Sequence, residues 1–174
     1  MKKLNLPLTK QQLLSLKAGE HVLLSGEIIT ARDAAHKRLA DLLNSGAPLP
    51  FELNGKTVYY AGPCPAPDGF SCGACGPTTS GRVDGYTPLM LDSGLAAMIG
   101  KGDRSKEVYD AIKQRGSVYF AAIGGAGALY GAAVTSSQVL AFPELLSEAV
   151  HLLEIRDFPV IVAIDSDGNS IYKK

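Results

Sequence analysis

Residues 21–48 read HVLLSGEIITARDAAHKRLADLLNSGAP, in which a pattern typical of a β-strand passes directly into one typical of an α-helix. Residues 21–30 are mostly apolar, and Gly26 predicts a kink or bulge within this strand. From residue 31 onward apolar side chains recur every three or four positions, which predicts an amphipathic helix that ends at Gly46 and Pro48. The side chains on its apolar face are Ala31, Ala34, Ala35, Leu39, Leu42 and Leu43. A strand followed at once by a helix indicates an α/β protein.

Strand and helix patterns alternate along the rest of the chain. A T-x-x-Q capping box that starts at Thr9 predicts a short helix, and Asn54-Gly55 predicts a tight hairpin between residues 51–53 and 56–60. Further strands are predicted at 2–7, 95–99, 118–123, 138–142, 150–155 and 160–164, and further helices from 79 or 80 to 93, from 103 or 105 to 115 and from 124 to 133. There is no fixed-period repeat, so we expect residues 1–174 to form a single compact mixed α/β domain.

The overall composition narrows the class of protein. The 174 residues contain 17 Lys plus Arg and 17 Asp plus Glu, so no net positive field exists to hold nucleic acid or an anionic membrane. No apolar run approaches the ~18–20 residues of a membrane-spanning helix, and no apolar signal-peptide core follows Met1-Lys2-Lys3-Leu4. We therefore expect a cytoplasmic protein without a nucleic-acid or membrane partner.

The three cysteines lie together in a segment that is rich in glycine and proline. Cys64, Cys72 and Cys75 are an odd number, which argues against a secreted disulfide framework and favours a reducing compartment. Cys72 and Cys75 form one CxxC, a spacing that can chelate a metal or form a redox pair. A structural zinc site needs a second pair of ligands, and the three histidines are scattered singly. The alternative is that these are small thiols packed in a glycine-rich loop.

Residues 76–82, with the sequence GPTTSGR, place three hydroxyl groups at a predicted helix start. The free N–H groups and the positive dipole end of a helix attract anions there. An i to i+4 spacing would bring the Thr78 hydroxyl and the Arg82 guanidinium to one side of the helix, where they could address a carboxylate and the carbon next to it. The alternative reading is that these Thr and Ser residues only cap the helix.

Two further cations lie where a predicted strand ends. Arg32 follows the strand at 21–30, and Lys101 stands between Gly100 and Gly102. Each alone could be a solvated surface charge, but three cations at such junctions favour a small polyanion such as a dicarboxylate. Phosphate is the competing ligand. The glycine-rich turn at 124–127, however, matches neither the P-loop nor the dinucleotide-binding pattern.

Five motifs together resemble one enzyme family over almost the whole chain. They are ARDAAH (31–36), GPTTSGRVD (76–84), Lys101-Gly102, IGG (123–125) and DFP (157–159). They look like the C-terminal region of the iron–sulfur (class I) fumarase and L-tartrate dehydratase family, which some organisms encode as a separate β subunit. The resemblance implies a swivelling β/β/α domain that closes over a 4Fe-4S cluster held by an α subunit, and hence a hetero-oligomer.

The same resemblance implies roles for five residues of this chain. Thr78 and Lys101 would be catalytic, with Thr78 as the proposed base, while Arg32, Thr79 and Arg82 would bind the substrate dicarboxylate. The family places the cluster thiolates on the other region, so none of the cysteines here is expected to bind the cluster. Gly81 and Asp84 look more like the fumarase form of the motif than the tartrate form.

Three hypotheses follow from these observations. The first is the β subunit of an iron–sulfur fumarate hydratase, which interconverts fumarate and L-malate. The second keeps the enzyme type but changes the substrate to L(+)-tartrate. The third is a small metal or redox module that uses Cys72 and Cys75, with the threonine and arginine residues serving as caps and surface charges.

Overall fold

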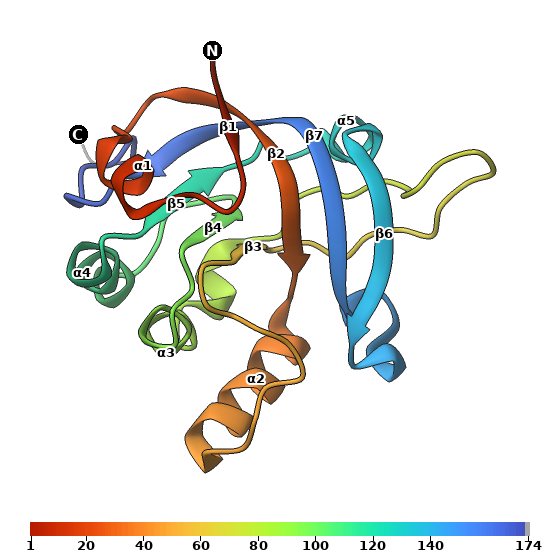
Figure 1. Ribbon diagram of the computed structural model, residues 1–174, viewed down its shortest axis with the longest axis horizontal. Helices are drawn as coiled ribbons and strands as arrows, with labels where there is room; N and C mark the ends of the chain where they lie inside the picture. Colours follow the sequence, from red (N-terminus) through yellow and green to blue (C-terminus); the bar gives the residue numbers. More distant parts are fainter. Residues whose placement is uncertain (173–174) are drawn as a thin grey trace.

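The computed structural model describes residues 1–172, in which helices and strands alternate for most of the chain (Figure 1). The strands are β1 (Lys2–Asn5), β2 (His21–Thr30), β3 (Thr57–Tyr59), β4 (Ala97–Gly100), β5 (Val118–Ala121), β6 (Val134–Ala141) and β7 (Val150–Ile164). The α-helices are α1 (Lys10–Ser15), α2 (Asp33–Ser45), α3 (Thr87–Asp92), α4 (Lys106–Arg115) and α5 (Gly127–Ala132), and the 3₁₀ helices are η1 (Ser80–Val83) and η2 (Pro143–Glu148). The predicted mixed α/β class is confirmed.

All of these strands belong to one sheet, in the order β1-β2-β3-β4-β5-β7-β6. Strands β1 to β5 run parallel to one another. Strand β7 runs antiparallel to its three partners, β2, β5 and β6. Because β7 pairs with both β2 and β5, the ladder β2-β3-β4-β5-β7 returns to its first strand and the sheet closes on itself. The parallel strands therefore present all their carboxyl ends at one edge of this ring.

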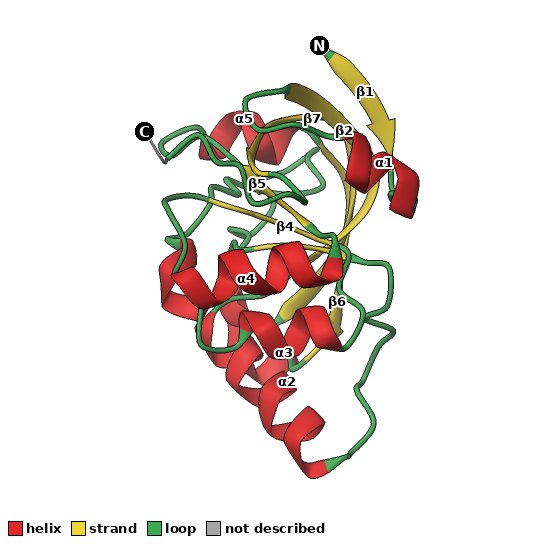
Figure 2. Cartoon of the chain, turned by 90° about the vertical axis from the view of Figure 1, so that its left-hand side faces the viewer, coloured by secondary structure: helices red, strands yellow, loops and turns green. Residues whose placement is uncertain are grey.

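Successive side chains of the strands enter two separate cores. In β5, for example, Phe120 belongs to a core to which α1 and α5 contribute, while Tyr119 belongs to a core shared with α2, α3 and α4. This alternation follows from the period of two in a strand. Figure 2 shows α2, α3 and α4 stacked along one side of the sheet. None of the helices in residues 1–172 has the length and apolar character needed to cross a membrane.

Several local signals have the predicted effect. The Thr9 side chain accepts a hydrogen bond from the Gln12 backbone and the Gln12 side chain accepts one from the Thr9 backbone, which completes the capping box of α1. Gly46 ends α2 with a φ of 73°, a left-handed conformation that glycine adopts without strain. The register between β2 and β7 shifts between Leu24 and Gly26, which confirms the predicted irregularity in this strand.

The predicted hairpin at Asn54-Gly55 is wrong. A tight turn is present, with Gly55 at a φ of 74°, but residues 51–53 form no strand. Strand β3 pairs instead with β2 and β4, parallel to both. A turn-forming dipeptide reports the local backbone and does not determine which strand pairs with which.

Two further boundaries differ from the prediction. Residues 150–164 form one long strand, β7, rather than two, because Phe158 and Pro159 continue its ladder with β2. Its first half also pairs with β6 and its second half with β5. The single helix expected from residue 79 or 80 to 93 is divided into η1 and α3. The last three residues of the GPTTSGR segment therefore begin a short 3₁₀ turn, and Thr79, which precedes this turn, lies on extended backbone.

Candidate active site at the carboxyl edge of the sheet

Four neighbouring parallel strands end at the same level and carry the predicted site residues just beyond their ends. The last residues of β2 and β3 are register partners, as are the last residues of β4 and β5. Arg32 follows β2, and Lys101 follows β4. Clefts outside the carboxyl ends of parallel strands are the usual ligand sites of α/β sheets. The topology therefore brings residues far apart in the sequence to one edge.

Thr78 is attached to the end of β3. Its backbone N–H and its hydroxyl group both donate to the Tyr60 carbonyl oxygen, at 2.7 and 3.1 Å. Ala61 and Pro77 form an antiparallel bridge just beside this contact. The donated proton leaves the lone pairs of Thr78 Oγ1 available as acceptors, and the half-buried side chain lies in a fixed direction.

Thr79 and Lys101 lie side by side in a parallel bridge beyond β4. The Ser80 N–H donates to the Lys101 carbonyl oxygen at 3.0 Å, and the Lys101 N–H donates to Ser80 Oγ at 3.0 Å. The Lys101 side chain runs past Gly124, where a Cβ atom on this glycine would lie 3.7 Å from Lys101 Nζ. The glycine-rich turn after β5 therefore borders the ammonium group.

Arg82 and Arg32 are connected through Asp33. Arg82 Nε donates to Asp33 Oδ1 at 3.1 Å, and this ion pair is exposed, with 57% and 36% of the two side chains accessible. Asp33 is the first residue of α2, and Arg32 is its N-cap. The guanidinium of Arg82, carried on η1, is thus held next to the helix start that carries Arg32.

Arg32 has a buried donor without a partner. Its Nε is inaccessible and makes no hydrogen bond within residues 1–172. The side chain passes Gly62, where a Cβ would come within 3.1 Å of its Cδ and Nη1 atoms. An unsatisfied buried N–H is costly, so Arg32 Nε is a donor that lacks its acceptor. The structure thus brings Arg32, Thr78, Thr79, Arg82 and Lys101 to one sheet edge.

His36 supports this edge and was not singled out from the sequence. Its Nδ1 lies 2.8 Å from the Arg32 carbonyl oxygen, and its ring packs edge-on against Tyr60 at 5.4 Å. Burial lowers the pKa of His36 to about 4, so the ring is neutral at neutral pH and its Nδ1–H donates to Arg32. In the sequence His36 is the last residue of the ARDAAH motif and lies four residues after Arg32, but neither feature assigned it a role.

The three cysteines differ in exposure and are not gathered at one position. Cys64 is exposed, Cys72 and Cys75 are buried, and all three are free thiols. Within residues 1–172 no three His, Cys, Asp or Glu side chains are grouped as ligands. The donor set of this chain therefore does not fit a 4Fe-4S cluster, which needs several thiolates around one position.

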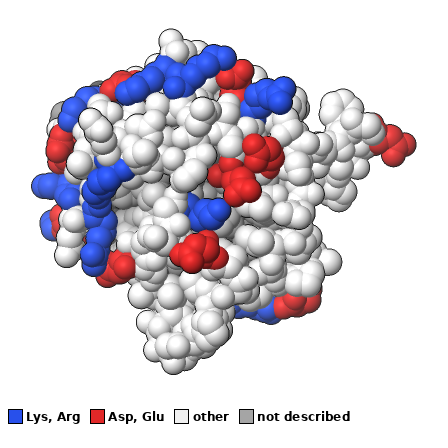
Figure 3. Space-filling model, in the orientation of Figure 1, with Lys and Arg blue, Asp and Glu red and all other residues white. Residues whose placement is uncertain are grey.

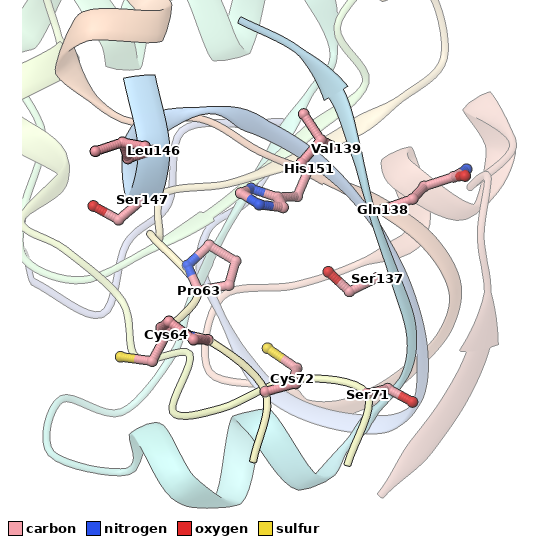
Figure 4. Close-up of a pocket in the computed structure, with 12 residues that line it drawn as sticks. Pro63, Cys64, Ser71, Cys72, Ser137, Gln138, Val139, Leu146, Ser147 and His151 are labelled. Atoms are coloured by element: carbon pink, nitrogen blue, oxygen red, sulfur yellow. The ribbon is translucent and has the colours of Figure 1, made fainter. Parts of the chain in front are cut away.

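Cys64 and Cys72 instead line a cavity of about 470 Å³ that also includes His151, the register partner of Thr30 at the end of β2 (Figure 4). Figure 4 shows the cysteine loop on one side of this cavity and residues of β6 and β7, among them Ser137 and His151, on the other. In Figure 3 the protruding part of the same loop shows uncharged surface and one acidic group, and Asp68 is the single charged residue in the stretch 61–81.

Comparison with known proteins agrees with this arrangement. The model of the fumarase C-terminus family matches residues 1–174. The chain belongs to this family. It is 41% identical over 167 residues to fumarate hydratase 2 of Leishmania major, a match that covers 95% of this chain and 29% of that protein. It is 39% identical over 153 residues to the aerobic class I fumarate hydratase of Escherichia coli K12, covering 87% of this chain and 28% of that protein.

A third relative has a similar length. The chain is 40% identical over 173 residues to the putative L(+)-tartrate dehydratase subunit beta of Methanocaldococcus jannaschii, with coverage of 96% of this chain and 89% of that protein. This member of the fumarase C-terminus family thus spans less than a third of the two fumarate hydratases and nearly all of the β subunit. The identities to the two kinds of relative are almost equal.

Proposed function

We propose that this chain is the β subunit of an iron–sulfur-dependent fumarate hydratase, a hydro-lyase that interconverts fumarate and L-malate. One observation carries the proposal: three cations and two threonines from separate segments gather at the carboxyl edge of the sheet. The similarity to fumarate hydratases and to a dehydratase β subunit supports it.

The three cations exceed the two negative charges of a dicarboxylate by one, which suits a reaction that adds negative charge to the substrate. Removing a proton from a carbon next to a carboxylate increases the negative charge on that carboxylate, and each well-placed donor contributes ~3–4 kcal/mol in a closed site. Arg32 offers an unpaired Nε, and Arg82 offers an exposed guanidinium whose present partner is a carboxylate. Lys101, directly after β4, offers a compact ammonium charge. We propose that the two arginines bind the substrate and that Lys101 stabilises the charge that develops.

Thr78 is the proposed base. The hydroxyl proton is held by the Tyr60 carbonyl oxygen at 3.1 Å, so an Oγ1 lone pair can be directed at a substrate C–H. A positioned base contributes ~10²–10⁴ in rate, but a neutral hydroxyl is weak, so it needs a neighbouring cation or a carboxylate of the partner to activate it. Thr79, exposed beside Lys101, is proposed as a further substrate contact.

We propose that an α subunit carries the 4Fe-4S cluster. The thiols of this chain are divided between an exposed site and a buried pair, which do not suit a cluster. In this proposal residues 1–174 act as one swivelling domain of a cytoplasmic hetero-oligomer, and the cationic edge closes over the cluster subunit. The second substrate, L(+)-tartrate, remains the alternative, because the matched β subunit is a putative tartrate dehydratase.

The test is reconstitution with the cluster-bearing subunit from the same host. The complex is expected to turn over L-malate faster than L(+)-tartrate, and the isolated chain neither. A preference for tartrate would replace the substrate and keep the enzyme type. Thr78→Ala is expected to lower turnover by at least about 10²-fold while the isolated chain stays folded, with Thr135→Ala, on exposed β6, as the matched control.

Metal analysis of the isolated chain tests the third hypothesis. Stoichiometric iron or zinc that is lost in Cys72→Ser would establish a metal module and contradict a cluster held wholly by the partner. We expect no bound metal, because Cys75 is fully buried and no third donor joins the CxxC pair within the described residues.

A further inference from the structure

Arg104 is a buried cation directly beneath the candidate active site. Its side chain is 0% accessible, and it belongs to the loop between β4 and α4, three residues after Lys101. Its Nε donates to Asp84 Oδ1 at 2.6 Å, and its Nη2 donates to Thr87 Oγ1 at 2.7 Å and to Tyr60 Oη at 3.4 Å. The planar guanidinium thus joins its own loop to Tyr60, just beyond β3, and to the stretch that contains Asp84 and Thr87.

The faces of the same guanidinium contact two aromatic rings. Its central carbon lies 5.2 Å from the centre of the Tyr60 ring and 4.8 Å from that of Tyr119. Burial alone would lower the pKa of Arg104, but Tyr60 and Asp84 outweigh it and the pKa is raised, so the side chain is charged. A charge in this place is unusual, because buried guanidinium groups are strongly desolvated.

Two partners of Arg104, Tyr60 and Asp84, lie next to predicted site residues. Tyr60 provides the carbonyl oxygen that binds the Thr78 hydroxyl and N–H. Asp84 directly follows η1, which carries Arg82, and its Oδ2 accepts from the Ser105 N–H at 2.6 Å. The Arg104 guanidinium therefore joins Tyr60, just beyond β3, to Asp84, just after η1.

Tyr119 connects Arg104 to Lys101. Its hydroxyl group donates to the Gly102 carbonyl oxygen at 2.9 Å and lies 2.9 Å from Ser80 Oγ. Ser80 Oγ in turn accepts from the Lys101 N–H at 3.0 Å. With Tyr119 donating to Gly102, Ser80 donates to Tyr119 and accepts from Lys101, so each proton has one acceptor. The Lys101 backbone is thereby linked through Ser80 to Tyr119, whose ring packs against the Arg104 guanidinium.

We propose that Arg104 is a positioning residue that sets the relative placement of Thr78, Arg82 and Lys101 without touching the substrate. The proposal rests on the proposed function. A purely structural ion pair could be exchanged for apolar groups of similar size without loss of stability, as buried pairs often can. A positioning residue could not be exchanged in this way without loss of catalysis, because a misplacement of about 1 Å costs on the order of 10²-fold in rate.

The experiment uses the complex with the cluster-bearing subunit and two variants. The double variant Arg104→Met with Asp84→Asn removes both charges and leaves none unpaired, and Arg104→Lys keeps the charge but loses the fork. We expect the double variant to lower kcat by about 30- to 100-fold, with a smaller change in KM, and Arg104→Lys to recover part of the loss. Circular dichroism and thermal unfolding give the folded fraction, so that kcat is expressed per folded molecule.

The matched control is Arg115→Met with Asp92→Asn. This is also an arginine–aspartate pair, 2.7 Å between Nη2 and Oδ1, but it is exposed and away from the carboxyl edge. We expect wild-type kcat from it. An unchanged kcat in the Arg104 double variant, or an equal loss in the control, would overturn the proposal.

A second readout separates this proposal from the proposed function. Amide chemical shifts of the full isolated chain report the positions of Thr78, Arg82 and Lys101 without turnover. In Arg104→Lys we expect shifts at all three residues, and unchanged shifts would overturn the positioning role. Absence of malate and tartrate turnover in the wild-type complex would instead reject the proposed function. If the double variant does not fold, Arg104→Lys alone decides, through its kcat and its shifts.

Discussion

Two arginine–aspartate pairs involve the short 3₁₀ helix η1, one through Arg82 within it and one through Asp84 directly after it, and they differ in distance and exposure. Arg82 and Asp33 meet at 3.1 Å with 57% and 36% of their side chains exposed. Arg104 and Asp84 meet at 2.6 Å with 0% and 12% exposed. The chemistry of the two pairs is identical, so their difference comes from the environment.

The comparison shows how one sheet edge can combine a replaceable contact with a permanent one. An exposed pair is worth ~0–1 kcal/mol, so a substrate carboxylate can replace Asp33 at little cost. A buried pair cannot lose one partner without leaving an uncompensated charge. His36 responds to both pairs: burial lowers its pKa most, the Arg104 charge lowers it further, and the Asp33 charge raises it. Substitutions in each pair therefore test whether burial accounts for the difference.

Asp84→Asn breaks the buried pair and is expected to have the largest effect. Removing one partner leaves the Arg104 charge uncompensated and costs ~3–5 kcal/mol in the free energy of unfolding. Urea unfolding of the isolated chain measures it. Asp33→Asn is the matched variant in the exposed pair, with an expected loss below about 1 kcal/mol. Equal losses in the two variants would show that burial does not distinguish the pairs.

Arg82→Ala removes the exposed cation and is expected to act on catalysis rather than on stability. The loss of one donor to the substrate carboxylate is expected to lower kcat/KM by ~10²–10³, or ~3–4 kcal/mol, while the unfolding curve stays the same. Arg82→Lys is expected to recover only part, because an ammonium group cannot bind a carboxylate with two parallel hydrogen bonds. Steady-state kinetics of the complex, with Arg38→Ala as control, decides. A stable variant with full activity would remove Arg82 from the site.

The buried side chain of His36 predicts that the free energy of unfolding depends on pH. The pKa of His36 is about 4 in the folded chain and ordinarily 6.5, so the unfolded chain binds more protons between these values. Stability therefore falls by ~3 kcal/mol as the pH is lowered from about 6.5 to 4. Unfolding free energies of the wild type and of His36→Gln at pH 7 and 4.5 measure this. We expect a flatter profile in His36→Gln and no such change in His151→Gln, and parallel profiles for all three would contradict it.

Asp33→Asn is expected to give the smallest effect, in the direction of tighter binding. The variant frees Arg82 from its competing carboxylate, so KM for the dicarboxylate is expected to fall by up to about 5-fold, the equivalent of one exposed ion pair. Asp41→Asn breaks the exposed pair with Lys37 on the same helix and is the control. A higher KM in Asp33→Asn would mean that Asp33 orients Arg82 for binding instead of competing with the substrate.

The parts of the fold that could be predicted from the sequence are those determined by local chemistry. The capping box at Thr9, the glycine that ends α2 and the irregularity at Gly26 each depend on backbone geometry within a few residues. The wrong hairpin at Asn54-Gly55 and the undivided strand β7 have one cause. Strand pairing depends on residues distant in the sequence, and no local pattern encodes it.

Some residues of the candidate site could be predicted from the sequence and others could not. Thr78, Arg82 and Lys101 could be singled out because hydroxyl and cationic groups beside glycines stand out along the chain. Arg104 could not, since as a sequence position it was one more charged residue between a strand and a helix, where exposure is the usual state. Only the fold shows that its side chain is inaccessible and binds Asp84 and Thr87.

The sequence by itself determined the α/β class, most of the helices and strands, and the types of side chain available for an anion site, because these depend on side-chain period and local backbone preference. Only the tertiary structure decided that four parallel strands end together, and which of two arginine–aspartate pairs is buried. Strand order and burial arise from long-range packing, in which residues that are distant along the chain exclude water from one another.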